Sequence, residues 1–551
     1  MKTVIIGGVA GGASCAARLR RQDERAEIVL LERGAYISYA NCGLPYHVGG
    51  VIPSKSALLL QSPEGLRTRF AIDVRVRNEV TSINCKAKTV TVRRADSGEV
   101  YQESYDTLVI ATGSSPMRPP IPGIDSQRIT TLWTVADAQR IRALAVSQEI
   151  HAVAVVGGGF IGLEMAENLR EAGLSVALIE AANQVMPPLD YEMALPLHAE
   201  LQRNGVALHL GDGVSAFKET AAGVDVVLQS GATVTAELVV LAIGVRPNGA
   251  LAKDAGLAVN ARGGVVVDAF LRTSDPSIYA VGDVIEVNEL VFGGKAMIPL
   301  AGPANRQGRL VADHIAGEQI PYAGTQGTSV AKVFGLTAAS TGASEKTLIS
   351  RGMILAKDYQ RVLIVQNHHA AYYPGAEPMV LKLLFAADGS RLFGAQIVGA
   401  QGVDKRIDVL ATALRLGASV SDLATLELAY APPYSSAKDP VNMLGFVAGN
   451  VLRGSVAFAS WDALERNPQA AVLDIREAGE VAAFALPSAI HIPLGELRDR
   501  LEELPKDREL IVVCGVGVRA NTAARMLAQH GFDQVSIYPG GTYFYRLTHG
   551  A

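Results

Sequence analysis

The sequence predicts an α/β fold in which short apolar strands alternate with helices, and two stretches carry this prediction. TVIIGGVAGGASCAARLRR at residues 3–21 has the pattern of a strand, a glycine turn and a helix, and AVAVVGGGFIGLEMAENL at residues 152–169 repeats that order. Each stretch is followed by an apolar strand that ends in an acid, IVLLE at Glu32 and SVALIE at Glu180. Together these parts predict two Rossmann-like dinucleotide-binding units.

Composition predicts a folded protein of several domains. The 551 residues are 49% hydrophobic and 19% charged, which favours large packed cores over disorder. The net charge of −4 provides no basic footprint for a nucleic acid. No run of about 18 apolar residues is present, and the N-terminus enters a short apolar strand at once. We therefore expect no membrane span and no signal peptide.

The four cysteines are Cys15, Cys42, Cys85 and Cys514, and they form no CxxC pair and no metal-ligand pattern. We expect no disulfide framework, no metal site and a reducing, cytoplasmic location. Cys15 lies inside a predicted helix and Cys85 between predicted strands, so both are expected to be structural. Cys42 lies in YISYANCGLPY at residues 36–46, ten residues after Glu32, and is the candidate redox thiol.

The first glycine turn contains Gly7, Gly8, Gly11 and Gly12, with Val9 where the middle glycine of the fingerprint is usual. A helix N-terminus after such a turn attracts phosphate through free N–H groups and the helix dipole. Glu32 follows about 20 residues past the last glycine, where a carboxylate can bind ribose hydroxyl groups. A tight turn with no ligand is the alternative.

The helix after this turn carries Ser14, Arg18 and Arg21 at spacings of four and three residues, which puts them on one face. One interpretation is a solvated helix face. The other is a clamp for a second phosphate-bearing ligand, distinct from the one bound by the turn.

The second turn has the full GxGxxG pattern in Gly157, Gly159 and Gly162. Glu180 would repel a 2′-phosphate, and no arginine follows it closely, so NADH is favoured although NADPH stays possible. Two further strands end in small residues, YDTLVIATG and VVLAIG, and Asp283 follows Gly282 after the strand of SIYAVGD. An acid in that place can reach a ribityl chain or a pyrophosphate, or it can be a simple turn residue.

TVIIGG, ATG, GGGFIG, AIGVRPN and YAVGD occur in an order that resembles the flavoprotein disulfide reductases over roughly residues 1–450. More narrowly, ANCGLPY, YYPGA and AYAPPYSSAKDP resemble the coenzyme A-disulfide reductases and the related persulfide reductases. The resemblance implies FAD, a nicotinamide nucleotide and coenzyme A as ligands, and a homodimer. The positions that it assigns to FAD are Gly7, Gly11, Gly12, Glu32, Arg33, Thr112, Gly113, Asp283 and Ala301. Those that it assigns to NADH are Gly157, Gly159, Ile161, Gly162, Glu180 and Gly244.

Two departures within this superfamily indicate that Cys42 works alone. Members that resemble glutathione reductase have a second cysteine five positions further, where this chain has His47. Single-cysteine peroxidases and oxidases have a histidine in the first turn, where this chain has Ala10. The partner of Cys42 would then be a substrate thiol. The coenzyme A positions implied by the resemblance are Ser14, Arg18, Arg21, Ser38, Asn41, Asn305 and Lys438.

Residues 321–450 lack a third glycine turn and alternate strands such as MVLKLLF with the helix DKRIDVLATALRL. In the resembled family this is the dimerisation domain, and its tyrosines, here Tyr372 and Tyr430, reach the partner's active site. Core aromatic residues are the alternative. The predicted domains are an FAD-binding domain in two parts, 1–112 and 244–320, an NADH-binding domain at 113–243, and this dimerisation domain.

After about residue 450 the α/β pattern restarts, and residues 455–551 resemble a rhodanese domain. Cys514 begins the loop CGVGVR, which continues through Gly515, Val516, Gly517, Val518 and Arg519. A thiolate at a strand end, surrounded by backbone N–H groups and a helix N-terminus, has a lowered pKa and can hold a persulfide. Asp474 and Arg476 are expected to form a structural pair. An interaction module is the alternative for this domain.

These features predict an FAD-dependent NADH oxidoreductase that reduces coenzyme A persulfide or polysulfide, and coenzyme A disulfide, through Cys42. Cys514 would carry sulfane sulfur. Because a plain disulfide reductase does not need such a domain, we favour persulfide reduction over disulfide reduction. A redox sensor or sulfur-transfer adaptor with little turnover is the alternative of a different class. Tyr372 and Tyr430 would act on the departing thiolate as catalytic residues.

Overall fold

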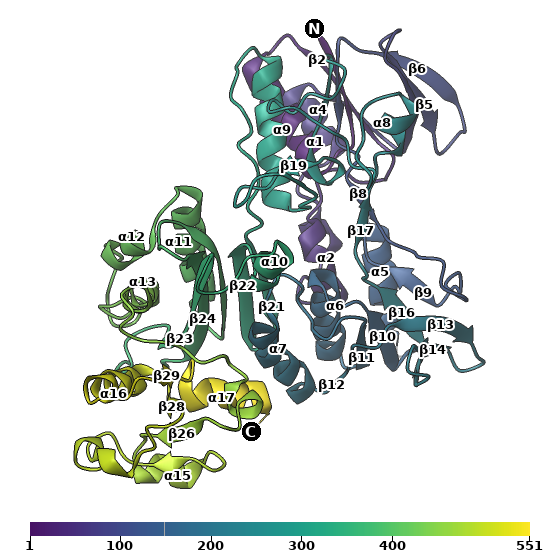
Figure 1. The fold of residues 1–551 in the computed structure, drawn as a ribbon. Helices are drawn as coiled ribbons and strands as arrows, with labels where there is room; N and C mark the ends of the chain where they lie inside the picture. The colour runs from purple at the N-terminus through teal and green to yellow at the C-terminus, as the bar shows by residue number, and fades with distance from the viewer. Residues whose placement is uncertain (148, 551) are drawn as a thin grey trace. The chain divides into compact units, whose positions relative to one another are not determined.

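The computed structural model describes residues 1–147 and 149–550, so residue 551, the last of the predicted 455–551 domain, lies outside it. The chain forms two compact units (Figure 1). Unit 1 comprises residues 1–185 and 205–327, and unit 2 comprises residues 186–204 and 328–551. No helix in the described ranges is both long enough and apolar enough to cross a bilayer.

The first sheet of unit 1 is parallel and follows the order β18-β7-β1-β2-β3. Its strands are β1 (Lys2–Ile6), β2 (Glu27–Glu32), β3 (Asp73–Val76), β7 (Thr107–Ile110) and β18 (Ile278–Ala280). Helices α1 (Ala10–Gln22) and α9 (Ala301–Ile315) pack together so closely that a Cβ on Gly308 would lie 2.1 Å from the Gly11 carbonyl oxygen. This contact packs the first turn of α1 against the middle of α9.

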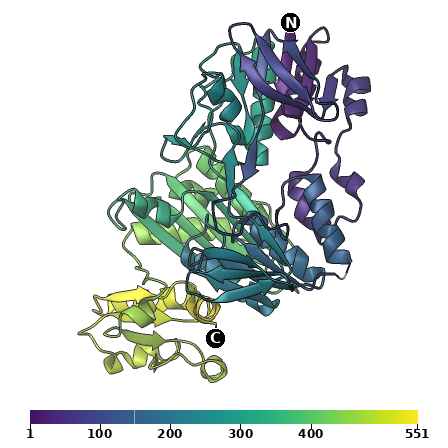
Figure 2. The ribbon, with the colours of Figure 1, turned by 90° about the vertical axis from the view of Figure 1, so that its right-hand side faces the viewer.

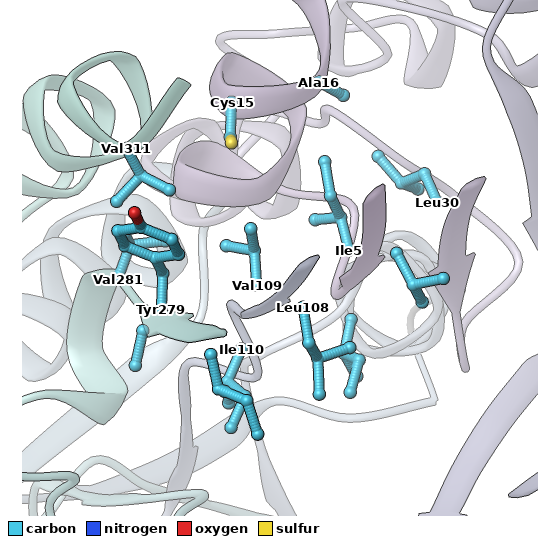
Figure 3. Packing of buried hydrophobic residues seen from close by; sticks show 14 of the residues in the cluster. Ile5, Cys15, Ala16, Leu30, Leu108, Val109, Ile110, Tyr279, Val281 and Val311 are labelled. Atoms are coloured by element: carbon cyan, nitrogen blue, oxygen red, sulfur yellow. The ribbon is translucent and has the colours of Figure 1, made fainter. Parts of the chain in front are cut away.

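Apolar side chains fill the space between this sheet and the helices α1 and α9 (Figure 3). Ile5 and Val109 come from the strands, Cys15 from α1 and Val311 from α9, and all four are fully buried. Cys15 is therefore a packing residue, as predicted. Burial raises the pKa of its thiol to about 12, followed by the charge of Asp313, so it stays protonated.

The second parallel sheet of unit 1 follows the order β12-β11-β10-β16-β9. Its strands are β9 (Ile129–Thr131), β10 (Ala152–Val156), β11 (Ser175–Glu180), β12 (Val206–Leu210) and β16 (Leu238–Leu241), with helices α5 (Val135–Val146) and α6 (Phe160–Glu171). The predicted strand, turn and helix order at both glycine turns is confirmed, and an all-parallel sheet needs such helical crossovers.

Smaller elements complete unit 1. Two antiparallel sheets are formed by β4 (Asn78–Asn84), β5 (Thr89–Arg94) and β6 (Val100–Ser104), and by β13 (Val214–Glu219), β14 (Val224–Leu228) and β15 (Thr233–Ala236). Two short strand pairs are β8 (Ser114–Pro116) with β17 (Val245–Pro247), and β19 (Val287–Asn288) with β20 (Lys295–Ala296). The short helices are α2 (Leu44–Val48), α3 (Lys55–Leu58), α4 (Pro63–Phe70) and α8 (Ala250–Asp254).

Unit 2 is built on an antiparallel sheet of order β21-β22-β25-β24-β23, seen in green in Figure 2. Its strands are β21 (Ser329–Val333), β22 (Leu336–Gly342), β23 (Tyr359–Asn367), β24 (Pro378–Ala386) and β25 (Leu392–Gly399). The helices are α7 (Tyr191–Arg203), α10 (Glu345–Ser350), α11 (Val403–Arg415), α12 (Val420–Thr425) and α13 (Pro440–Leu452). Helix α7 packs in unit 2 although its sequence neighbours β11 and β12 belong to unit 1.

The C-terminal part of unit 2 has a parallel sheet of order β27-β26-β28-β29. Its strands are β26 (Ala471–Asp474), β27 (Ile490–His491), β28 (Leu510–Val513) and β29 (Val535–Ile537), with helices α14 (Ala463–Arg466), α15 (Ala478–Ala483), α16 (Val518–Gln529) and α17 (Gly541–His549). This sheet agrees with the C-terminal α/β domain that the sequence predicts.

Candidate functional site

The first glycine turn has the backbone geometry of a nucleotide site. Gly7 has φ +105°, and a Cβ on Gly12 would lie 1.9 Å from the Gly7 carbonyl oxygen, so both positions require glycine. Val9, the residue before α1, makes no side-chain cap, which leaves the first N–H groups of this helix to a ligand. The valine that departs from the fingerprint therefore does not block the turn.

Glu32 is fixed beside this turn at the end of β2. Its carboxylate accepts hydrogen bonds from the N–H of Gly8 at 2.8 Å and of Gly34 at 2.7 Å. Arg33 is exposed next to it. An anchored carboxylate beside open helix N–H groups fits the ribose and pyrophosphate of a dinucleotide.

The other positions assigned to FAD lie in unit 1 around the ends of β7 and β18. Thr112 donates its hydroxyl to the Asn248 carbonyl at 3.0 Å, and Gly113 has φ +64°. Asp283 accepts a hydrogen bond from Ser114 at 2.8 Å, and burial raises the pKa of its carboxyl. Ala301 begins α9, which also has no side-chain cap. These polar groups and open helix ends fit an FAD molecule.

The second turn repeats this geometry in its own sheet. Gly157 has φ +108°, and a Cβ on Gly162 would lie 1.8 Å from the Gly157 carbonyl oxygen. Gly159 begins α6 without a side-chain cap, and a Cβ there would meet nothing within 4 Å among the described residues. Glu180 accepts hydrogen bonds from the N–H of Gly158 at 2.6 Å and of Ala182 at 2.8 Å. Ile161 lies in the first turn of α6, and Gly244 has φ +108° before β17.

Cys42 lies in a short 3₁₀ turn, Asn41–Gly43, that runs directly into α2. The residue lies on the surface of the described chain. Partial burial of the sulfur raises the pKa of this thiol, and the charges of Glu164 and Asp283 raise it further. The neighbouring side chains thus oppose the thiolate that the sequence argument requires, so a bound ligand or cofactor would have to stabilise it.

His47 stands where a second cysteine would be needed for a dithiol. It is buried, and its Nδ1 lies 2.7 Å from the Ile52 carbonyl oxygen. It therefore has a structural hydrogen bond and cannot form a disulfide with Cys42.

The residues predicted for coenzyme A are only partly brought together. Ser14 of α1 donates its hydroxyl to the side-chain oxygen of Asn305 of α9 at 2.6 Å, so these two predicted residues are in contact. Arg18 is paired with Asp313 at 2.6 Å, and the Arg21 guanidinium lies 5.0 Å from the centre of the Phe70 ring. The face of α1 that carries Ser14, Arg18 and Arg21 is therefore not fully solvated, and its Arg18 is not free of an acidic partner. Ser38 has φ +43° and donates its N–H to Gly8, Asn41 precedes Cys42, and Lys438 is exposed in unit 2.

Cys514 lies between β28 and α16 in a loop that points N–H groups at its sulfur. Its Sγ accepts hydrogen bonds from the N–H of Gly517 at 3.1 Å and of Ala520 at 3.4 Å. Gly517 has φ +99°, and Val516 and Val518 are exposed on the loop that begins with Gly515. Two backbone N–H groups thus point at this sulfur, as the sequence argument expects of a persulfide carrier.

Arg519 closes this loop through two hydrogen bonds of 2.6 Å to the Glu480 carboxylate of α15. The hydrogen bonds from Arg519 hold the pKa of Glu480 at about 2. Behind the loop, Arg476 pairs with Asp474 at 2.6 Å, and both are buried, which confirms the predicted structural pair.

Tyr372 and Tyr430 are surface residues of unit 2, so the alternative that they are core aromatics is wrong. Their side chains are 74% and 47% exposed, and their hydroxyl oxygens are 2.7 Å apart. Arg406 on α11 holds the two loops that carry them, because it donates to the His368 carbonyl at 2.7 Å and to Asp439 at 3.0 Å.

The comparisons with known proteins agree with this geometry. The sequence model of the pyridine nucleotide-disulphide oxidoreductases matches residues 1–308, more than half of the chain. The chain belongs to this family of oxidoreductases. Family membership implies FAD and a nicotinamide nucleotide, and the two glycine turns fit both. The dimerisation domain of the family matches residues 328–440, which indicates a homodimer, and a rhodanese-like domain matches residues 460–545.

Three relatives of this oxidoreductase cover most of its length. Coenzyme A disulfide reductase from Staphylococcus epidermidis is 34% identical over 448 residues, which is 81% of this chain and 99% of that protein. The crystal structure of reduced Bacillus anthracis CoADR-RHD is 48% identical, with a TM-score of 0.95 over 100% of this chain and 98% of that one. The NAD-dependent persulfide reductase from A. fulgidus is 38% identical, with a TM-score of 0.94 over 99% and 100%.

The structure adds residues to the oxidoreductase site that sequence reasoning missed. Tyr46 lies on α2, four residues after Cys42 in the chain, and its phenol lies near the Glu164 carboxylate of α6. Position i+4 from the thiol was a usable sign for Tyr46. No pattern pointed to Glu164, which precedes Met165 in an ordinary amphipathic helix.

A second missed cluster lies in unit 2, where Asp190, Glu192 and Glu345 approach one another as metal ligands would. The Lys382 ammonium lies among them, at 2.8, 2.5 and 2.7 Å from the three carboxylates. Burial lowers the pKa of Lys382, but the three negative charges outweigh it and raise that pKa overall. The lysine itself is the cation of this site.

Cys85 is half-buried, and its Sγ lies 3.6 Å from the Ala255 carbonyl oxygen. This contact agrees with the structural role predicted for it.

Proposed function

We propose that the protein is an FAD-dependent NADH oxidoreductase that reduces coenzyme A persulfide or polysulfide, and coenzyme A disulfide, through Cys42. The observation that carries the proposal is one exposed thiol, without a second cysteine at His47, in the same unit as two nucleotide-binding turns. The overall reactions are CoA–S–SH + NADH + H⁺ → CoA–SH + H₂S + NAD⁺ and CoA–S–S–CoA + NADH + H⁺ → 2 CoA–SH + NAD⁺. FAD supplies the hydride chemistry between the nicotinamide and the sulfur.

The chain's own residues would bind and orient the reactants. Glu180, fixed by Gly158 and Ala182, presents a carboxylate that repels a 2′-phosphate, which supports NADH over NADPH. Ser14 and Asn305 would bind coenzyme A together with Arg18 and Arg21.

Further positions would complete the coenzyme A site. Ser38 and Asn41 precede Cys42 in unit 1. Lys438, in unit 2, would also bind coenzyme A. Tyr372 and Tyr430 of the partner subunit would donate hydrogen bonds to the departing thiolate. Their paired, exposed hydroxyl groups support this role.

Cys514 distinguishes persulfide reduction from plain disulfide reduction. Its sulfur accepts two backbone hydrogen bonds in a loop suited to a persulfide, and disulfide reduction has no need of such a loop. The rhodanese-like domain would therefore handle sulfane sulfur for Cys42. The whole chain resembles the persulfide reductase over nearly its full length, which also supports persulfide reduction as the first candidate. Plain coenzyme A disulfide reduction is the second candidate, favoured by the staphylococcal relative.

The test is anaerobic NADH oxidation with coenzyme A persulfide and with coenzyme A disulfide. We expect Cys42→Ser to abolish both reactions, and Cys514→Ser to spare disulfide reduction while lowering sulfide release from a polysulfide donor. Cys85→Ser is the matched control, because its thiol makes only a structural contact. Retained turnover in Cys42→Ser would show that Cys42 is not the nucleophile. Equal losses of disulfide reduction and of sulfide release in Cys514→Ser would show that Cys514 has no separate role in sulfur transfer. A single stoichiometric reduction without turnover would identify a sensor or an adaptor.

A denaturing mass measurement tests the ligand directly. We expect a thiol-releasable coenzyme A adduct on the peptide that contains Cys42. Its absence from protein isolated under oxidising conditions would argue against coenzyme A.

A further inference from the structure

Two loops of unit 2 are joined by their backbones where their tyrosines meet. The β23–β24 loop carries Tyr372, and the α12–α13 loop carries Tyr430. The Ala370 N–H of the first loop donates to two carbonyl oxygens of the second, of Pro432 at 3.3 Å and of Ser435 at 3.1 Å. The Tyr372 and Tyr430 hydroxyl oxygens lie 2.7 Å apart. The contact between the phenols thus depends on how the two loops are held together.

One buried guanidinium contacts both loops. Arg406 of α11 is 1% exposed, and its Nη2 donates to the His368 carbonyl oxygen of the β23–β24 loop at 2.7 Å. The same nitrogen lies 3.3 Å from the Tyr434 carbonyl oxygen and 3.1 Å from the Ser435 hydroxyl oxygen, both in the α12–α13 loop. Because Nη2 carries only two hydrogens, it shares them between acceptors on the two loops.

Asp439 completes this buried cluster. Its Oδ2 accepts hydrogen bonds from Arg406 at 3.0 Å and from the Ser435 hydroxyl at 2.5 Å. Its Oδ1 accepts from the Val441 N–H at 3.0 Å, so Asp439 also caps the start of α13. The three side chains of the cluster are at most 3% exposed. The end of the α12–α13 loop is therefore fixed to the same guanidinium as the β23–β24 loop.

Stability alone is a weak reason for an arginine at this position. The Arg406 Nε–H has no hydrogen-bond partner in the part of the chain that the structure describes, and an unsatisfied buried donor opposes folding. Desolvation of the two buried charges also offsets much of the attraction between Arg406 and Asp439. What arginine adds is a planar group that reaches several acceptors at once. Its place is fixed, because a Cβ on Gly402 would lie 2.5 Å from its Nη1.

We propose that Arg406 is a positioning residue that holds Tyr372 and Tyr430 as one hydrogen-bonded pair. This inference rests on the role proposed above for the two tyrosines. When the hydroxyl oxygens are 2.7 Å apart, one hydroxyl donates to the other, so one phenolic hydrogen of the pair is left for the departing thiolate. The two tyrosines are 58 residues apart in the chain, and Arg406 joins the loops that bring them together. Loss of Arg406 should therefore separate the phenols and make them act independently.

The first test observes the pair without turnover. The holoenzyme is labelled with 3-fluorotyrosine, and the fluorine resonances of Tyr372 and Tyr430 are assigned by their loss in Tyr372→Phe and Tyr430→Phe. Because a hydrogen bond to a phenol changes the shielding of its ring, Tyr430→Phe should shift the Tyr372 resonance. In the Arg406→Lys background, Tyr430→Phe should leave the Tyr372 resonance where it is. An equal shift in both backgrounds would overturn the proposal.

The second test is a double-mutant cycle on kcat with coenzyme A disulfide. In the otherwise wild-type enzyme, Tyr372→Phe and Tyr430→Phe together should lose about as much as the more damaging single change, because either change breaks the pair. Arg406→Lys should lower kcat about three- to tenfold and leave KM for NADH unchanged. In that background, the losses from the two tyrosine changes should multiply. The same non-additive losses with and without Arg406 would contradict the proposal.

Two further variants separate positioning from stability. Arg476→Lys alters another buried arginine–aspartate pair of unit 2, so it should lower Tm as Arg406→Lys does but keep kcat for coenzyme A disulfide. Ser435→Ala removes the hydroxyl between Arg406 and Asp439 and keeps their ion pair. It should weaken the tyrosine coupling in the same direction at a smaller cost in Tm. An equal loss of kcat in Arg476→Lys would show that Arg406 acts through stability alone.

The two tests distinguish failure of this proposal from failure of the proposed function. If the wild type does not turn over coenzyme A disulfide but its fluorine coupling depends on Arg406, the positioning is correct and the proposed function is wrong. If the wild type turns over normally and the coupling is the same in Arg406→Lys, the function stands and the positioning is wrong.

Discussion

Replacement of Lys382 by methionine removes the cation at the centre of the buried cluster in unit 2, whose elements α7, α10 and β24 are labelled in Figure 1. Lys382 is 2% exposed and bonds three carboxylates, on Asp190, Glu192 and Glu345. Methionine has a similar length but no charge, so the packing volume is kept while the carboxylates lose their common donor. The variant therefore isolates the charge.

The magnitude depends on what each carboxylate keeps. Asp190 still accepts from the Gln396 side chain at 2.6 Å, and Glu345 keeps the Arg361 guanidinium at 2.8 and 2.9 Å. Glu192 keeps no hydrogen-bond donor among the described residues. One buried carboxylate left unpaired costs about 3–5 kcal/mol, so this is the loss of unfolding free energy that we expect at pH 7.

The pH dependence has a definite sign. Burial opposes ionisation of Asp190 and Glu345, but the charge of Lys382 outweighs it, and the pKa of both carboxyls is lowered. Their stabilising contribution is therefore present above their unfolded pKa and is lost as the pH falls through the folded one. Without Lys382, burial raises these pKa values, and protonation relieves the buried charge. The destabilisation by Lys382→Met should thus be largest at pH 7 and shrink as the pH falls to 4.5.

Tryptophan fluorescence during urea unfolding measures this loss. Trp461 belongs to unit 2, and its ring centre lies 5.9 Å from that of Tyr191 on α7, so Trp133→Phe leaves a probe of the correct unit. Lys357→Met, at an exposed position, is the control and should change little. Adding Glu192→Gln to Lys382→Met should restore part of the stability. A loss below 1 kcal/mol, or one independent of pH, would refute the reasoning.

Two further predictions concern the nucleotide and sulfur sites. Gly162→Ala brings a Cβ to 1.8 Å from the Gly157 carbonyl oxygen, so we expect a loss of about 1–3 kcal/mol in stability together with weaker NADH binding, measured by thermal unfolding and fluorescence titration. Gly159→Ala, where the Cβ meets no described atom within 4 Å, should weaken NADH binding but keep the stability, and equal stability losses in both variants would contradict this. Glu480→Gln removes the negative charge and one of the two acceptor oxygens that bind Arg519, and it should slow sulfur transfer from thiosulfate to cyanide several-fold. Because the pKa of Glu480 is about 2, this loss should be constant from pH 5 to pH 9, and the exposed Glu502→Gln should show none.

Features that depend on near neighbours in the chain were predictable. Both glycine turns need glycine because a carbonyl five residues back lies within 2 Å of a Cβ, and this geometry is confined to one strand, turn and helix. The Asp474–Arg476 pair joins residues two positions apart, and it too was expected from the sequence.

Features that join distant segments were not predictable. The helical face of Ser14, Arg18 and Arg21 was visible, but whether Arg18 is unpaired depends on Asp313, which lies 295 residues away. The exposure of Tyr372 and Tyr430 was equally undecided, because an aromatic residue in a loop that contains proline suits either a core or a surface.

The sequence by itself determined the two glycine turns, the position of Cys42 without a second cysteine at His47, and the loop that begins with Cys514, because each is set by residues within one turn or one loop. Only the tertiary structure decided that Arg18 pairs with Asp313 and that Lys382 pairs with three buried carboxylates. The physical reason is that the ionisation of a buried group depends on charges brought close in space by packing, and helix or strand periodicity carries no record of those partners.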